Sequence, residues 1–351
     1  ILIDIGAHGF DMLPALDEFA THCEAGVRVV VMGQTNDIHF YRELKQRGVV
    51  EYFTQPARAA DIRAILIQKA PRAAQRQTDM AQGAVISCIS AASGDGSSTL
   101  ALNLAYALAN EYKQPTVLVD MDYQFGLISK SLDLPAPFGI RELFDHPERG
   151  LDDMLVSKML VPYKGELKII AAPSELRLLP GIHPEVIREL VSILRTKFAF
   201  VVIDVPHVWM DWTAAALTYS DHVVMVAQLW LRSLTHATRL MAAWQSIGIK
   251  PEQVSLVINR SGAKFKEAIT VADFERISRH KVDAYVNNDV RAITQAENNA
   301  QTLFETEHGA QLKQQIAALA RELASRYGVA VKQESESKRG LLTFVRKRRE
   351  P

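Results

Sequence analysis

The sequence predicts an α/β fold, a doubly wound parallel sheet covered by helices. Short, continuous apolar runs alternate with longer helical stretches along most of the chain. Such runs are typical of strands buried on both faces, and their alternation with helices predicts parallel pairing. A loop of small residues follows one of these runs, and a ligand is expected to bind at this loop.

The composition is that of a soluble globular protein. The 351 residues are 48% hydrophobic and 23% charged, which is enough for two or more cores. Forty basic residues balance forty acidic ones, so the chain as a whole lacks the charge expected of a DNA-binding protein, although a local patch could still bind DNA. No apolar run reaches the roughly 18 residues that are needed to cross a bilayer.

Two further features bear on location and extent. Cys23 and Cys88 have no partners at metal-ligand spacing and are expected to be buried free thiols in a reducing cytosol, so a cytoplasmic protein is predicted. The chain begins at Ile1, with neither an initiator Met nor a signal peptide. We therefore expect residues to be missing at its N-terminus.

Residues 1–70 predict a partial domain. Three short β-rich runs alternate with three helical stretches, which predicts a parallel sheet. The expected strands cover residues 1–5, 27–32 and 50–53, and the expected helices cover residues 12–21, 38–46 and 59–69. Three strands make half of a doubly wound sheet, so upstream residues are expected to complete it.

A polar segment separates this region from the main domain. Residues 71–83 contain Pro and Gly and lack periodicity, as expected of a linker. Residues 84–330 then predict the main domain, and residues 331–351 predict a tail. The expected strands of the main domain are residues 85–90, 116–120, 167–171, 198–204, 222–226 and 254–259, with helices at 100–111 and 309–327.

The first candidate site is the loop that follows the strand at 85–90. Glycines in this loop would let the backbone curve around phosphates, and Ser98 or Thr99 could offer a hydroxyl to Mg²⁺. The predicted nucleotide-binding residues of the loop are Gly94, Asp95, Gly96, Ser97, Ser98 and Thr99. The loop also half-matches a dinucleotide-binding fingerprint, and a tight turn without a ligand is a further alternative.

Carboxylates end two of the expected strands. Asp120 and Asp122 follow the run VLV, and Asp204 closes the run FAFVVI. Because the C-terminal ends of parallel strands border the ligand crevice, such carboxylates can hold Mg²⁺ and orient a water. We predict a metal site of Ser98, Asp120 and Asp204, with Asp122 activating water. The alternatives are a ribose-binding acid, a helix cap and a chance acid at a strand end.

Asn259 and Arg260 end another apolar strand. A carboxamide can pair with both the donor and the acceptor on the edge of adenine, so we predict that these two residues bind the nucleotide. A simple turn is the alternative.

In this order the motifs resemble the MinD/ParA family of deviant Walker ATPases over residues 84–330. The family pattern is Lys-Gly-Gly-x-Gly-Lys-Ser/Thr, Asp-x-Asp, a strand-terminal Asp and Asn-x-Arg, the last shortened here to Asn259-Arg260. The resemblance implies a P-loop fold, ATP and Mg²⁺ as ligands, and a homodimer. The family's signature lysine, which reaches across the dimer, falls on Ala92, and its Walker lysine falls on Ser97.

The missing lysines affect binding and turnover differently. A lysine–phosphate contact contributes roughly 1.5 to 3 kcal/mol, so its loss should weaken binding about ten- to a hundredfold while the backbone still holds the phosphates. Removing one preorganised donor can lower a rate by about 10²- to 10³-fold. We therefore predict ATP binding with slow turnover or none.

Within this family the chain is most similar to the TadZ/CpaE branch of pilus assembly proteins. The similarity lies in the loop Gly-x-Gly-Ser-Ser-Thr, in YQFG after the second Asp, and in VNNDVRAITQAENNAQTLFE, where Asn287 replaces the usual proline. It implies partners in a Flp-type (tight-adherence) pilus or a related type II/IV secretion apparatus.

That branch also carries an N-terminal receiver-like, flavodoxin-like domain, and residues 1–70 resemble the last three β-α units of one. Asp4 stands where the phosphoacceptor would lie, but Gly33 replaces the expected Thr or Ser, and Gln55 replaces the expected Lys before Pro56. A phosphoaspartate would lack its two main protein partners. We expect a degenerate docking module, not a phosphoswitch.

The tail SKRGLLTFVRKRREP places apolar side chains beside a basic cluster. Such a segment can lie on an anionic membrane as an amphipathic helix, and it is similar to the MinD membrane-targeting tail. A disordered, solubilising terminus is the alternative, because so short a helix is marginal in water.

The leading functional prediction is a cytoplasmic localisation and assembly factor of a Flp-type pilus, at the inner membrane or cell pole, in which ATP binding controls dimerisation or docking. One alternative is a cycling MinD/ParA-type ATPase that uses another cation. A DNA-partitioning protein is disfavoured by the zero net charge. A Rossmann oxidoreductase would leave Asp204 and Asn259 without a role.

Overall fold

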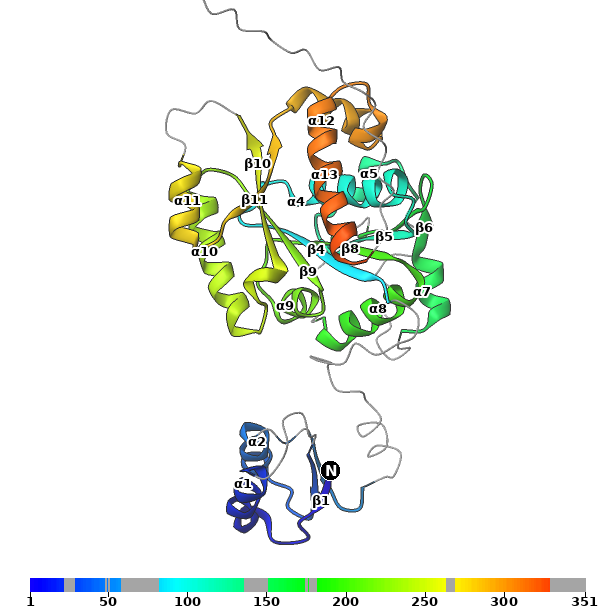
Figure 1. Cartoon of the computed structure of the whole chain (residues 1–351). Helices are drawn as coiled ribbons and strands as arrows, with labels where there is room; N and C mark the ends of the chain where they lie inside the picture. Colours follow the sequence, from blue (N-terminus) through cyan, green and yellow to red (C-terminus); the bar gives the residue numbers. More distant parts are fainter. Residues whose placement is uncertain are drawn as a thin grey trace, which may run out of the picture. The chain divides into compact units, whose positions relative to one another are not determined.

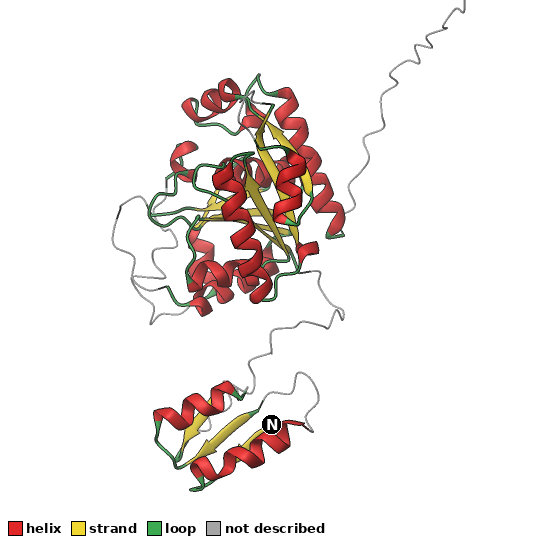
Figure 2. Cartoon of the chain, turned by 90° about the vertical axis from the view of Figure 1, so that its left-hand side faces the viewer, coloured by secondary structure: helices red, strands yellow, loops and turns green. Residues whose placement is uncertain are grey.

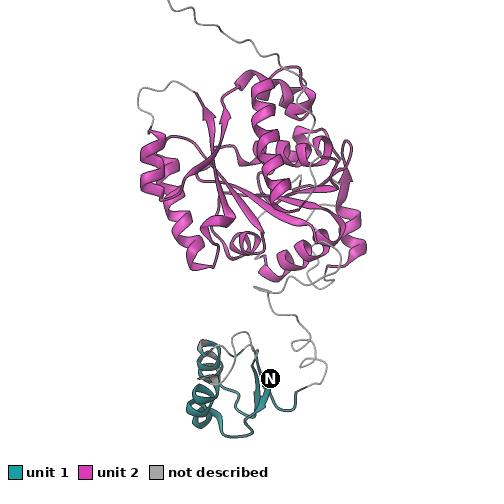
Figure 3. Ribbon diagram, viewed as in Figure 1, with its two compact units in different colours: residues 1–79 teal, residues 80–351 magenta. Residues whose placement is uncertain are grey.

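The chain forms two compact units, residues 1–79 and residues 80–351 (Figure 3). The structure, a computed structural model, describes residues 1–21, 29–47, 49, 51–57, 82–135, 151–173, 176, 182–262 and 269–328. The expected helix at 59–69, almost all of the linker at 71–83, Cys23 and the tail lie outside the described residues.

Unit 1 is a three-stranded parallel sheet in the order β1-β2-β3 with helices packed against it (Figure 1). Its elements are β1 Leu2–Asp4, η1 Gly9–Met12, α1 Leu13–Thr21, β2 Val30–Gly33, α2 Ile38–Gln46 and β3 Glu51–Thr54. Phe40 and Leu44 on α2 pack with Val31 and Leu16 in a small core. The predicted parallel arrangement of these three strands is confirmed.

The end of β1 in unit 1 is tied to the segment after β3. Gln55 Nε2 donates to both carboxylate oxygens of Asp4, each at 2.9 Å. Gly33, at the end of β2, has no room for a side chain because a Cβ there would lie 2.7 Å from Ile5 Cγ1. Gly33 and Gln55, the two residues that depart from the receiver pattern, are therefore both packed closely near Asp4 and the end of β1.

Unit 2 is built on an eight-stranded sheet in the order β11-β10-β9-β4-β8-β5-β7-β6 within the described residues (Figure 1). All neighbours pair in parallel except β6, which runs antiparallel to β7. The strands are β4 Ala84–Ser90, β5 Thr116–Asp120, β6 Leu160–Pro162, β7 Leu167–Ile170, β8 Phe200–Val205, β9 His222–Ala227, β10 Val254–Ser261 and β11 Val282–Asn287. The predicted α/β fold is confirmed, with an antiparallel edge strand that the sequence did not indicate.

Helices cover both faces of this sheet (Figure 2). One layer contains α4 Ser97–Tyr106, its π-helical continuation η2 Ala107–Glu111, and α13 Ala310–Arg326. The other contains α8 Pro184–Lys197, α9 Asp211–Thr218, α10 Leu231–Ser246 and α11 Val271–Ser278. The remaining elements are α5 Ile128–Ser131, α7 Asp153–Met159, η4 Pro251–Gln253, α12 Val290–Asn298 and η5 Leu303–Glu305.

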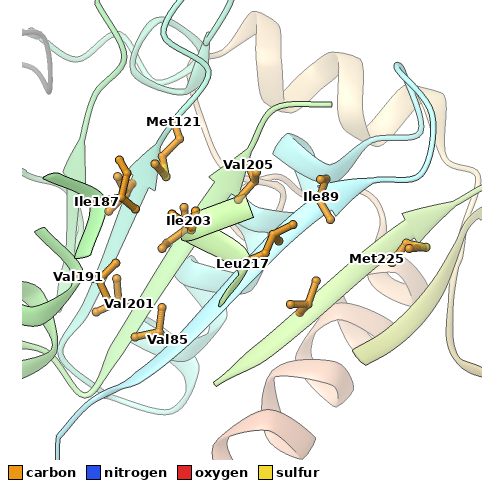
Figure 4. Packing of buried hydrophobic residues seen from close by; sticks show 14 of the residues in the cluster. Val85, Ile89, Met121, Ile187, Val191, Val201, Ile203, Val205, Leu217 and Met225 are labelled. Carbon is orange, nitrogen blue, oxygen red and sulfur yellow. The ribbon is translucent and has the colours of Figure 1, made fainter. Parts of the chain in front are cut away.

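Alternate residues of the central strands enter two separate cores, because successive side chains of a strand point to opposite faces. In β8, Val201 and Ile203 pack with α8 and α9 (Figure 4), whereas Phe200 and Val202 pack with α4 and α13. This double burial explains the continuous apolar runs in the sequence.

The first strand of unit 2 is fixed where it begins. The Gly83 amide donates to the Arg195 carbonyl at 2.8 Å, and the Ala84 amide donates to the Ala199 carbonyl at the same distance. A Cβ at Gly83 would lie 1.8 Å from the Phe198 carbonyl oxygen, so only glycine fits this close approach.

Among the described residues, none of the helices combines the length and the apolar character that a bilayer-crossing helix requires.

Candidate functional site

The loop between β4 and α4 has the backbone of an anion cradle. Gly94 and Gly96 adopt φ values of +86° and +101°, which L side chains rarely adopt, and Gly96 caps α4. The start of a helix leaves amides without intrahelical acceptors, here those of Gly96, Ser98 and Thr99. With the positive end of the helix dipole, they suit a phosphate without any charged side chain.

Asp95, between the two glycines, turns its carboxylate into the protein. The side chain is fully buried and accepts hydrogen bonds from the Ala92 amide at 2.8 Å, Ser233 Oγ at 2.9 Å and Gln228 Nε2 at 3.2 Å. Burial raises the pKa of Asp95, whereas the hydrogen bonds from these donors lower it. Asp95 thus ties the loop to the segment after β9 and to α10. Its carboxylate forms these hydrogen bonds within the protein.

Neither residue at the lost lysine positions presents a polar group at the surface of the loop. Ala92 is 1% exposed and Ser97 is 7% exposed. Ser97 Oγ accepts a hydrogen bond from Ser90 Oγ at 2.8 Å, and the Ser97 amide donates to the same Ser90 oxygen at 3.1 Å. Ser97 closes the base of the loop from within.

The structure brings the predicted metal residues together. Asp120 and Asp204 are register partners on the neighbouring strands β5 and β8, and both are buried. Asp120 accepts the amides of Asp122 at 3.1 Å and Ile128 at 3.3 Å. Asp204 Oδ1 has no hydrogen-bond partner among the described residues, although it is buried.

Two buried carboxylates side by side disfavour their own ionisation. Burial, and then the charge of Asp204, hold the pKa of Asp120 well above its ordinary value. Burial raises the pKa of Asp204 to about 7, although a hydrogen bond from the Ser98 side chain acts to lower it. A bound cation would reverse both shifts, so the orphaned oxygen and its surroundings fit Mg²⁺.

The number of protein ligands also fits this ion. No group of three or more His, Cys, Asp or Glu side chains with metal-binding geometry occurs in the described part of the chain. Mg²⁺ commonly takes only one or two carboxylates and fills its remaining positions with waters and substrate phosphates. Asp120, Asp204 and the Ser98 hydroxyl are a set of this kind.

Asp122 lies on the rim of the site. Its Oδ1 accepts the Phe125 amide at 3.0 Å, and its side chain lines a cavity of about 230 Å³ together with Ser98 and Thr99. The predicted water-activating residue therefore borders the same space as the start of α4.

Asn259 and Arg260 line a larger cavity of about 450 Å³, which also contacts Gly96 and Thr99. The Asn259 side-chain amide donates to the Asp95 carbonyl at 2.8 Å, and its oxygen accepts the Arg260 amide at 2.8 Å. Both polar atoms of Asn259 are thus engaged within the protein. The apolar side of the cavity is formed by Leu100, Val286, Val290, Ile293, Leu312 and Ile316.

Sequence reasoning did not find three residues at this site. Gln228 and Ser233 hold Asp95, and Arg232 Nη2 lies 3.4 Å from the Ser93 carbonyl oxygen. All three follow β9, whose end reaches the same edge of the sheet as the loop. Their position just after a predicted strand was the only indication in the sequence, because these contacts join residues more than 130 positions apart.

Comparison with known proteins agrees with this geometry. Residues 83–255 match the family model of an AAA domain. The septum site-determining protein MinD of Synechocystis sp. is 27% identical over 177 residues, which span 50% of this chain and 64% of that protein.

Two solved structures are similar over nearly their whole length. A ParA family ATPase from Chlorobium tepidum TLS superimposes with a TM-score of 0.63 at 22% identity, over 70% of this chain and 100% of that chain. MinD from Pyrococcus horikoshii OT3, complexed with Mg-ADP, gives a TM-score of 0.60 at 17% identity, over 71% and 99%. Unit 2 therefore has the fold of the MinD/ParA-type P-loop NTPases.

Proposed function

We propose that unit 2 binds ATP with Mg²⁺ and uses this binding, with little or no hydrolysis, to control dimerisation or the docking of partners. One observation carries the proposal: the amide cradle of Gly96, Ser98 and Thr99 adjoins an acidic pair in which the buried Asp204 Oδ1 lacks a partner among the described residues. An anion site and a cation site beside one another suit a metal-bound polyphosphate.

The residues have separate tasks in this proposal. The loop amides hold the phosphates, and Ser98, Asp120 and Asp204 hold Mg²⁺, which neutralises phosphate charge when bound. The 450 Å³ cavity that Asn259 and Arg260 line accepts the base. Asp122, on the rim, orients water if any turnover occurs.

Slow turnover follows from the loop. Charge that develops on the transferred phosphoryl group needs preorganised cations. Ala92 and Ser97 supply none, and both are buried. ATP would then act as a lasting ligand that stabilises one conformation.

The cellular role proposed is that of a localisation and assembly factor of a Flp-type pilus, in which the protein acts as a homodimer. The support is the sequence resemblance to the TadZ/CpaE branch in the loop and in YQFG. Unit 1 would serve as a docking module, and the tail would contact the membrane peripherally. Pull-down of other pilus components by the full chain tests this role, and failure to retain any of them would contradict it.

The nucleotide part is tested by calorimetry of ATP with Mg²⁺ on the full chain and on Gly96→Arg, together with a phosphate-release assay. Binding that the substitution abolishes, with release at background, supports the proposal. Absence of binding by the unmodified chain would overturn it. Steady release that Asp122→Ala abolishes would favour the cycling ATPase instead.

A further inference from the structure

We infer that Arg232 is the cation of the phosphate site and supplies, for ATP binding but not for turnover, part of the charge that the two missing lysines would supply. The inference rests on the proposed nucleotide binding and adds the residue that makes it possible. Arg232 stands in a different part of the chain from the loop, in the first turn of α10.

The position of Arg232 follows from the sheet. Strands β9 and β4 are parallel neighbours, so the segment after β9 leaves the sheet beside the loop that follows β4. Arg232 Nη2 lies 3.4 Å from the carbonyl oxygen of Ser93, next to Gly94. The guanidinium thus lies against the cradle of its own chain.

The contact leaves most of the guanidinium available. A guanidinium carries five N–H donors in a planar fork that matches phosphate oxygens. Within the described part of the chain, Arg232 makes one hydrogen bond to the loop. It is long for a hydrogen bond, and the side chain is exposed. The inference requires that this exposed side chain turn its remaining donors toward a polyphosphate held by the loop.

The charges near the loop also favour a cation there. Asp95 places a buried carboxyl group within the cradle. A bound polyphosphate would add several negative charges beside it. Arg232 interacts electrostatically with Asp95. It contacts the loop before Gly96, at Ser93, whereas Arg260 lines the 450 Å³ cavity beside Asn259.

The chain offers a matched control on the same helix. Arg239 is also exposed on α10. Seven residues are close to two helical turns, so Arg239 lies on the same face as Arg232, about 10 Å farther along the axis. Arg239→Ala changes the net charge and the helix propensity as Arg232→Ala does, but at a distance from the loop.

The experiment is calorimetry of ATP and AMP with Mg²⁺ on the full chain and on Arg232→Ala, Arg232→Lys, Arg239→Ala and Arg260→Ala. We expect Arg232→Ala to weaken ATP binding about ten- to a hundredfold, since a charge-assisted contact to phosphate is lost. AMP affinity should stay within about twofold, Arg232→Lys should recover part of the loss, and Arg239→Ala should bind like the unmodified chain. The ligand-free melting temperatures should agree, which excludes an effect on folding.

Three outcomes would overturn the inference. Equal ATP affinity for the unmodified chain and Arg232→Ala would show that the cation is elsewhere, and a loss for Arg260→Ala alone would place it there. An equal loss for ATP and AMP would show that Arg232 only holds Ser93 in place. No binding of any nucleotide by the unmodified chain would overturn the proposed function, and this inference with it.

Discussion

Asn259 donates its side-chain amide to the carbonyl oxygen of Asp95 at 2.8 Å, and so joins the end of β10 to the loop between β4 and α4. The same amide nitrogen lies against Gly96, where a Cβ would approach it to 2.4 Å. Two residues distant in sequence therefore fix one conformation of the loop, and this contact can be tested directly.

Gly96→Ala should abolish ATP binding, because the new methyl group would displace Asn259 and the residue would have to leave φ +101°. Gly248→Ala is the control, since Gly248 has φ +87° and no heavy atom lies within 4 Å of the place that its new methyl group would take. It should cost about 1 kcal/mol of stability, like other substitutions at positive φ, without loss of ATP binding. Calorimetry and urea unfolding measure both effects, and unchanged binding by Gly96→Ala would contradict the role of the contact.

Asp204→Asn should remove the dependence of ATP affinity on Mg²⁺. Without metal its melting temperature should equal or exceed that of the unmodified chain, because the substitution relieves the repulsion with Asp120. Titrations with and without Mg²⁺ check this, with the exposed Asp133→Asn as the control. An affinity that still rises with Mg²⁺ as in the unmodified chain would exclude Asp204 as a ligand.

Asp95→Ala should destabilise unit 2 by about 1 to 3 kcal/mol, because the donors on Ala92, Gln228 and Ser233 would lose their acceptor in a buried place. Urea unfolding followed by tryptophan fluorescence reports on this unit alone, since all four tryptophans lie within it. Ser233→Ala removes one donor and leaves the carboxylate two, so its smaller cost provides the comparison. A neutral Asp95→Ala would show that the network adds nothing to stability.

His222 should make the stability of unit 2 fall in mild acid. Burial lowers the pKa of His222 from 6.5 to about 4, so between these values the unfolded chain binds more protons than the folded one. Its contribution is complete above pH 6.5 and declines by up to about 3 kcal/mol as the pH approaches 4.

The acidic pair Asp120 and Asp204 acts in the opposite direction, because its pKa values are raised. The measurement is therefore the difference in unfolding free energy between the unmodified chain and His222→Gln at pH 7, 5.5 and 4. This difference should shrink as the pH falls. A difference for His222→Gln that does not vary with pH would contradict the prediction.

Asp4 should resist phosphorylation by acetyl phosphate. Gln55 Nε2 already occupies both of its oxygens, and Gly33 leaves no room for the hydroxyl that would accompany a phosphoaspartate. Intact-mass measurement of the treated chain should show no added phosphoryl group, with Asp4→Asn as the baseline. A phosphoryl group that Asp4→Asn eliminates would identify unit 1 as a phosphoswitch.

The strands buried on both faces could be predicted from the sequence almost to the residue, but the edges of the sheet could not. The prediction for β5 matched Thr116–Asp120, because its apolar run is continuous. Strand β11 was missed because only one of its residues, Val286, is fully buried, so VDAYVN has no continuous apolar run. Strand β6 has three residues at an antiparallel edge, too few to form a pattern.

The candidate site divides in the same way. Residues that end buried strands, such as Asp120, Asp204 and Asn259, could be placed because parallel strands end at one edge. The buried orientation of Asp95 could not, because it depends on donors from Gln228 and Ser233 on other elements. The sequence around Asp95 does not indicate contacts with residues so far along the chain.

Gly83 has a practical consequence for fragments of this chain. Its amide bonds to the Arg195 carbonyl in the last turn of α8, and the Ala84 amide bonds to the Ala199 carbonyl just before β8. The Phe198 carbonyl excludes any side chain at position 83. A fragment that begins at Val85 would lose both bonds and expose the start of the central strand β4. The shortest piece of unit 2 that keeps its native packing therefore begins no later than Gly83, and a protease that trims toward this unit should stall there.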